Sequence, residues 1–208
     1  MLLLNIFIYI GIIAAAMSGA LVGIKKQLDF FGIIVLANLT ALGGGIIRDV
    51  LIGYTPPVAF REPSYAIVGT VAAFLVMFFP KKFFRQVNII MFFDAIGLGV
   101  FTAVGANVAL QQKVSTTFIA VTIGVITGVG GGVIRDIFAK EIPLIFKKEV
   151  YATASIIGAL SLAFSRQFVG GMVPLYLCFV TTVIIRLLAI HFRIHQNVLD
   201  VKGVAIEE

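Results

Sequence analysis

Two copies of one short motif hold the residues of this chain that could act on a charged solute. Thr40-Ala-Leu-Gly-Gly-Gly-Ile-Ile-Arg-Asp49 returns as Thr127-Gly-Val-Gly-Gly-Gly-Val-Ile-Arg-Asp136, with seven of ten positions identical. Each copy places three consecutive glycines and an arginine–aspartate pair inside an apolar run. Ionisable side chains in such runs are costly, and they normally face partners or water. The motif therefore indicates a polar path or a polar joint between helices.

The glycine triplets predict a weak point in each helix. Three glycines in a row lose about 1 kcal/mol each relative to alanine, and freed backbone at membrane depth must be buried in protein or line a water-filled cavity. We therefore expect a kink or break that lines a pore, and close packing between helices remains the alternative. The glycines are Gly43, Gly44, Gly45, Gly130, Gly131 and Gly132.

The arginine–aspartate pairs are predicted to find partners elsewhere. Adjacent helical residues point about 100° apart, so we do not expect Arg48 to pair with Asp49, or Arg135 with Asp136. Freed carbonyls, the other copy or charged loop groups are the expected partners. The alternative is that these residues form salt bridges that only hold helices together.

Three further polar residues are candidates for the same path. Asp94 lies within an apolar run and could face the path, but pairing with Lys82 or Arg85 is favoured. Thr40 and Thr127 either bond to their own helix carbonyls and ease a bend, or line the path.

Two charged clusters flank apolar runs. Arg61 and Glu62 precede one run, and Lys147, Lys148 and Glu149 precede another. Such clusters usually anchor a helix at the membrane interface. Beside a cation path, Arg61, Lys147, Lys148 and Glu149 could also gate the path or contact lipid headgroups.

Composition identifies the solvent of the chain as lipid. Of 208 residues, 60% are hydrophobic and 12% are charged, about half the charged fraction of a soluble domain, and the mean hydropathy is +1.10. The net charge of +6 lies at the ends of apolar runs, which suits lipid headgroups and not nucleic acid. No set of side chains typical of an enzyme, a metal site or a cofactor site is found in the apolar runs.

Seven apolar runs predict an all-α membrane protein that forms a single membrane domain over residues 1–208. Twelve of the sixteen lysines and arginines fall on the side of the C-terminus, which predicts a cytoplasmic C-terminus and an outer N-terminus. The predicted helices are Asn5–Ile24, Phe30–Ile52, Ser64–Phe79, Asn88–Leu110, Thr117–Phe138, Val150–Phe164 and Val173–Phe192.

The motif belongs to a longer internal repeat. Further matches at an offset of 86, such as Gly11 with Gly97 and Tyr65 with Tyr151, extend it over about residues 5–80 and 88–166. The seventh helix, about 173–192, is unpaired. Because each repeat has three helices, the second must enter the membrane from the opposite face, which makes an inverted repeat.

The motifs, with Pro143 and the following Lys148-Glu149-Val150-Tyr151, resemble those of the prokaryotic trimeric intracellular cation (TRIC) channels, also grouped as proteins with paired glycine-transporter domains. The resemblance covers residues 6–192. It implies a homotrimer in a prokaryotic plasma membrane, with one pore in each protomer at the two glycine-rich helices. It also implies permeation by K⁺ and Na⁺, and a lipid or gating role for residues 148–150.

Two functions therefore follow from the sequence. The first is a passive channel for K⁺ and Na⁺, in which helix carbonyls supply negative potential. The second is a secondary transporter of a small solute such as glycine, because inverted repeats also serve alternating access.

Overall fold

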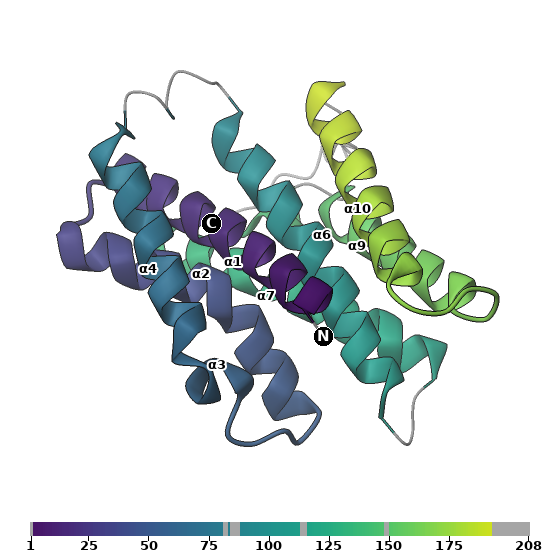
Figure 1. The fold of residues 1–208 in the computed structure, drawn as a ribbon. Coiled ribbons are helices and arrows are strands. Elements are labelled where there is room, and N and C mark those ends of the chain that lie inside the picture. The colour runs from purple at the N-terminus through teal and green to yellow at the C-terminus, as the bar shows by residue number, and fades with distance from the viewer. Residues whose placement is uncertain (1, 81–82, 84–87, 113–115, 148–149, 193–208) are drawn as a thin grey trace, which may run out of the picture.

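The chain folds into a bundle of packed helices (Figure 1). The computed structural model describes residues 2–80, 83, 88–112, 116–147 and 150–192. Within those ranges the regular secondary structure is entirely helical. The helices are α1 (Leu2–Lys25), α2 (Phe30–Leu51), α3 (Val58–Arg61), α4 (Pro63–Phe78), α6 (Ile89–Leu110), α7 (Thr117–Phe138), α8 (Leu144–Lys147), α9 (Val150–Ser165) and α10 (Val173–His191).

Five of the described helices, α1, α2, α6, α7 and α10, are long and apolar enough to cross a membrane, and α4 and α9 are apolar helices of 16 residues each. The chain is thus an all-helical membrane protein, and a helix lies in each of the seven predicted ranges. Local chemistry explains where the helices begin. The carboxylate of Asp29 accepts the amide of Gly32 to cap α2, and the Thr116 hydroxyl accepts the amide of Ile119 to cap α7.

Small residues form the centre of the bundle. The most buried spanning helices are α1 and α6, which pack against each other, and their buried faces consist largely of alanine and glycine. Small side chains let helix backbones approach closely, which is the main source of packing energy in lipid. Large side chains such as Phe31, Phe78 and Phe164 are exposed on the outside of the bundle, where lipid would cover them.

The glycine triplets do not break their helices. Both α2 and α7 are continuous α-helices through the triplets, so the predicted break is wrong. The triplets lie where the two helices cross. A Cβ on Gly44 would overlap the carbonyl oxygen of Thr127, and a Cβ on Gly131 would overlap that of Thr40. The glycines therefore permit contact between backbones, and the intact helices keep their amides bonded where lipid offers no partner.

Candidate functional site

Each arginine of the repeated motif pairs with the aspartate that follows it. Nε and Nη2 of Arg48 lie 2.9 and 2.7 Å from Oδ1 of Asp49, and those of Arg135 lie 2.9 and 2.8 Å from Oδ1 of Asp136. The prediction that these neighbours would not pair is wrong. The long arginine side chain spans the angle between adjacent positions, and two of its nitrogens reach one carboxylate oxygen.

The second oxygen of each aspartate holds a short helix. Oδ2 of Asp49 accepts the amide of Val58, 2.8 Å away, and Oδ2 of Asp136 accepts the amide of Leu144, 2.9 Å away. These amides begin α3 and α8, so each carboxylate joins a spanning helix to the following short helix. The glycine-rich helix, the ion pair and the short helix thus form one connected unit in each half of the chain.

Arg135 has two further partners. Its Nη1 lies 2.6 Å from Oδ1 of Asp94 and 2.7 Å from Oγ of Ser18, and the hydroxyl of Tyr151 donates to the same Asp94 oxygen over 3.4 Å. Arg135 is only 1% exposed. One guanidinium is therefore shared between two carboxylates, and its third contact comes from α1.

Asp94 thus pairs with Arg135. The predicted partners Lys82 and Arg85 lie outside the described residues.

Arg48 lacks the partners that Arg135 has. At the repeat offset of 86, Asp94 corresponds to Ile8 and Ser18 corresponds to Val104. Neither Ile8 nor Val104 can accept a hydrogen bond from its side chain. Among the described residues, Asp49 is the only side chain recorded as bonded to Arg48.

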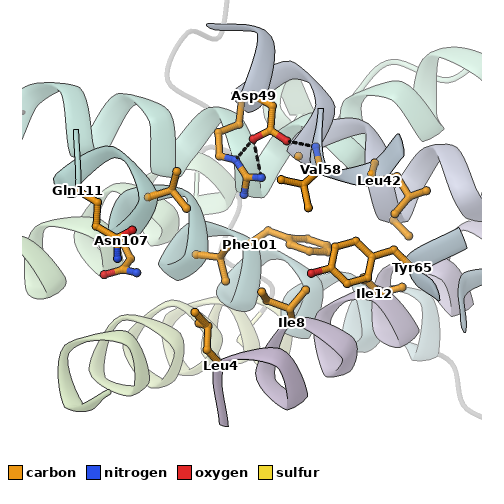
Figure 2. Close-up of a pocket in the computed structure, with 16 residues that line it drawn as sticks. Leu4, Ile8, Ile12, Leu42, Asp49, Val58, Tyr65, Phe101, Asn107 and Gln111 are labelled. Carbon is orange, nitrogen blue, oxygen red and sulfur yellow. Dashed lines mark hydrogen bonds and ion pairs between the residues drawn. The ribbon is translucent and has the colours of Figure 1, made fainter. Parts of the chain in front are cut away.

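Arg48 is one of the residues that line a cavity of about 180 Å³ (Figure 2). We call it the Arg48 cavity. Leu4 and Ile8 from the start of α1 line it, with Gln111 just after the end of α6. Its other polar groups are the side chains of Asp49, Tyr65 and Asn107, while most of its wall is apolar. Figure 2 shows the Tyr65 hydroxyl on the same side of the cavity as Ile8.

A second cavity of about 210 Å³ lies beside Arg135, and we call it the Arg135 cavity. Val22 and Lys25 from the end of α1 line it, as does Ile90 from the start of α6. The two cavities therefore lie at opposite ends of α1 and α6. Six lining pairs correspond at offsets of 86 or 87: Leu4/Ile90, Arg48/Arg135, Asp49/Asp136, Val58/Leu144, Val108/Val22 and Gln111/Lys25.

A void of about 10 Å³, the size of one water molecule, lies between the cavities. Phe101 lines both this void and the Arg48 cavity. Asp94 lines the void and bonds to Arg135, which lines the other cavity. Oδ2 of Asp94 is buried and has no hydrogen-bond partner in the described chain. The void therefore lies beside a buried carboxylate oxygen that could accept a further hydrogen bond.

The threonines of the motif are buried and bond to their own helices. The hydroxyl of Thr40 donates to the carbonyl of Leu36, and that of Thr127 to the carbonyl of Ile123, each over 2.6 Å. Gly19 of α1 packs closely against Thr40. Both threonines thus act at helix contacts, and Thr40 also lines the central void.

The glycines of one triplet have different neighbours. The middle glycine, Gly44, forms the backbone crossing, while a Cβ on Gly43 would overlap Ile134. A Cβ on Gly45 would meet only Nη2 of Arg48, at 3.8 Å. In the second triplet, Gly130 and Gly131 face α2, and Gly132 faces the Tyr151 hydroxyl.

The charged clusters lie at the ends of the short helices. Arg61 ends α3, is exposed, and donates to the carbonyl of Thr55 over 2.8 Å while its guanidinium lies 4.5 Å from the centre of the Tyr54 ring. Lys147 ends α8 and is also exposed. The predicted candidates Lys148 and Glu149 lie outside the described residues.

An ion pair at the edge of the Arg135 cavity gives a testable pH dependence. Nζ of Lys26 lies 2.7 Å from Oε1 of Glu141, and this hydrogen bond lowers the pKa of Glu141 below its usual value. A lowered folded-state pKa adds stability above the unfolded value, about 4.3, and that stability is lost as the pH falls through the folded value. Because Glu141 is 42% exposed, we expect Glu141→Gln to cost at most about 1 kcal/mol at pH 7.

Thermal unfolding of both proteins in detergent, measured from pH 7 down to about pH 3, checks this expectation. The difference between Glu141→Gln and the unchanged protein should shrink toward the acid end. A difference that grows on acidification would contradict it.

Sequence reasoning missed three buried partners. Sequence patterns single out Tyr151 only as a repeat match and as part of the family motif, and they indicate no role for Ser18, which precedes the repeated glycine Gly19. Arg186 of α10 is 1% exposed, its guanidinium lies 4.8 Å from the centre of the Tyr151 ring, and its Nε and Nη2 have no hydrogen-bond partner in the described chain. An arginine inside an apolar run was the available signal for that residue.

No group of three or more histidine, cysteine, aspartate or glutamate side chains within the described ranges could hold a metal ion. The residues around Arg48 (the Arg48 cluster) and those around Arg135 (the Arg135 cluster) offer ion pairing and hydrogen bonding.

Comparison with known proteins places these features in a family. The profile described as "Glycine transporter" matches the chain twice, over residues 5–81 and 91–167. The inner membrane protein YadS of Escherichia coli K12 is 38% identical over 201 residues, which cover 93% of this chain and 96% of YadS. YvgT of Bacillus subtilis is 35% identical over 185 residues, which cover 88% of this chain and 90% of YvgT.

Solved structures of similar proteins indicate the same family. A TRIC cation channel studied for its conductance is 40% identical, with a TM-score of 0.84 and coverage of 98% of each chain. A prokaryotic TRIC channel in 0.5 M KCl is 35% identical, with a TM-score of 0.87 and coverage of 92% of this chain and 98% of that one. The orthologue from Rhodobacter sphaeroides is 29% identical, with a TM-score of 0.87 and coverage of 93% and 100%. With its paired glycine-transporter matches and the fold of these channels, the chain belongs to the prokaryotic TRIC channel family.

Proposed function

We propose that the protein is a passive channel for monovalent cations, K⁺ and also Na⁺, and that each protomer has its own path. The path would run from the Arg48 cavity past Phe101 to the central void, and then past Asp94 and Arg135 to the Arg135 cavity. The observation that carries this proposal is the pair of cavities with corresponding linings at opposite ends of α1 and α6. Between them, α2 and α7 cross at the glycine triplets.

An inverted repeat explains this arrangement. If each half of the chain inserts from the opposite face, corresponding residues lie at opposite ends of the protein. The fold would then be seven spanning helices, two inverted three-helix units over about 5–80 and 88–166, and a seventh helix at about 173–192. The exchange of Leu4 for Ile90 and of Gln111 for Lys25 between the cavities supports this interpretation.

The charges suit a path that is closed in this state. The ion pair of Arg135 with Asp94 lies between the void and the Arg135 cavity, and the void holds about one water molecule. A cation that replaces the guanidinium beside Asp94 would find a buried carboxylate oxygen that has no hydrogen-bond partner among the described residues. Movement of Arg135 away from Asp94 is therefore the gating step that we propose.

Assembly and topology follow from the family and from charge. TRIC channels are trimeric by name, and the exposed apolar helix faces of this chain suit contact with lipid and with further copies. We propose a homotrimer in a bacterial inner membrane, as named for YadS, with an outer N-terminus and a cytoplasmic C-terminus. Arg61 and Lys147, at the ends of the short helices, would contact headgroups or take part in gating.

Recording from purified protein in a planar lipid bilayer tests the proposal. We expect discrete unitary currents in symmetric KCl, and a reversal potential in a KCl gradient that lies near the K⁺ equilibrium potential. Replacing K⁺ by Na⁺ should leave a measurable current. Saturable uptake of glycine into vesicles without unitary currents would instead support a transporter and contradict the channel.

A further inference from the structure

The two arginine clusters are built on one plan, and only one of them is complete. In the Arg135 cluster, the Asp94 carboxylate accepts from the guanidinium over 2.6 Å and from the Tyr151 hydroxyl over 3.4 Å. The Arg48 cluster has the corresponding arginine and the corresponding tyrosine, Tyr65, but Ile8 stands where the carboxylate would be.

The position that lacks the carboxylate faces a cavity. Ile8, Tyr65 and Arg48 all line the Arg48 cavity of about 180 Å³, and Figure 2 shows the side chains of Ile8 and Tyr65 on the same side of it. The Arg135 cluster demonstrates that this geometry accommodates a second carboxylate beside the neighbouring aspartate. We propose that the Arg48 cavity binds a small aliphatic monocarboxylate, whose carboxylate takes the place between Arg48 and Tyr65 that Asp94 takes between Arg135 and Tyr151.

The cavity walls define the rest of the ligand. Leu4, Ile12, Leu42, Phe101 and Val104 are apolar and suit a short hydrocarbon body. A cavity of about 150 Å³ accommodates benzene, so an acid of four or five carbons matches the volume. A zwitterion such as glycine fits less well, because both oxygens of Asp49, the acidic side chain lining this cavity, are already bonded to Arg48 and to the amide of Val58.

Isothermal titration of the purified protein in detergent tests this site without requiring conduction, so the result is independent of the channel proposal. Sodium butyrate, titrated at constant ionic strength against a sodium chloride blank, should give a saturable isotherm. Butyramide has the same body without the charge, and glycine has the charge without the body. Both should bind at least tenfold more weakly: butyramide because it loses the charge-assisted hydrogen bonds to Arg48, and glycine because it has no hydrocarbon body and adds an ammonium group that finds no free carboxylate oxygen on Asp49.

Variants identify the place of binding. Ile8→Asp would supply the missing carboxylate from the protein, and it should abolish butyrate binding. Asp29→Asn, which removes an exposed carboxylate outside the cavity lining, is the control and should retain binding. If Ile8→Asp does not purify as a folded protein, Tyr65→Phe serves instead, and it should weaken butyrate binding several-fold.

Absence of a saturable butyrate isotherm would overturn the proposal. So would butyrate binding that is unchanged in the folded Ile8→Asp variant, or in Tyr65→Phe where that variant is used. Tighter binding of palmitate than of butyrate would also overturn it, because the occupant would then be a membrane lipid chain and not a small free acid.

Discussion

Replacing Gly44 by alanine is expected to destabilise the protein by about 3 kcal/mol or more, at the upper end of the range for overpacked cores. The new methyl group would overlap the carbonyl oxygen of Thr127, which is backbone and cannot rotate away. The helices α2 and α7 would have to separate along their whole crossing. Gly131→Ala should have an effect of the same size, because its methyl group would overlap the carbonyl oxygen of Thr40.

The same triplet supplies a matched control. A methyl group on Gly45 would meet only the end of the Arg48 side chain, at 3.8 Å, and alanine is the better helix former by about 1 kcal/mol. Gly45→Ala should therefore be neutral or slightly stabilising. Thermal unfolding in detergent and the yield of assembled protein measure all three variants. Equal melting temperatures for Gly44→Ala and Gly45→Ala would show that the crossing is not a tight backbone contact.

The second large effect is expected from Asp94→Asn. Arg135 would keep Asp136 and lose the carboxylate at 2.6 Å, and breaking one partner of a buried pair costs about 3–5 kcal/mol when no partner remains. Because Asp136 stays, we expect a loss of stability below that range. On the proposed path, the less compensated cation should repel K⁺ and reduce unitary K⁺ conductance at least tenfold, since 1.4 kcal/mol is enough for that factor.

Unitary conductance and the reversal potential in a KCl gradient measure this effect, and the reversal potential should move toward the Cl⁻ value. Asp29→Asn is the control, because it removes one exposed carboxylate outside the cavity linings and asparagine also caps a helix. If Asp94→Asn conducts K⁺ as the unchanged protein does, the path does not pass Asp94.

Sequence patterns predicted the helices well because lipid imposes a simple rule. Each apolar run between charges became a helix, and the starts near Phe30 and Thr117 follow from capping by Asp29 and Thr116. The repeat also predicted residues that line the two cavities, since its most conspicuous matches, Arg48 and Arg135, line one cavity each.

Side-chain partners were harder to predict. The angle between Arg48 and Asp49 on a helix suggested that they could not pair. This criterion considers only the directions of the two side chains and not the length of a flexible arginine. The low helix propensity of three glycines suggested a break. Propensity does not include the stabilisation from backbone contact at Gly44 and Gly131. The sequence favours nearby loop cations as partners of Asp94, because nothing in one sequence shows that α6 and α7 bring it to Arg135.

The unequal arginine clusters have an electrical consequence. Arg135 has two carboxylate partners and Arg48 has one, because Asp94 in one half is matched by Ile8 in the other. A pore whose two mouths carry different fixed charge passes ions more easily in one direction than in the other. On the proposed path, a chain with two nearly matching halves would thus rectify, and the exchange of Ile8 for Asp94, together with that of Gln111 for Lys25, would set the preferred direction of current.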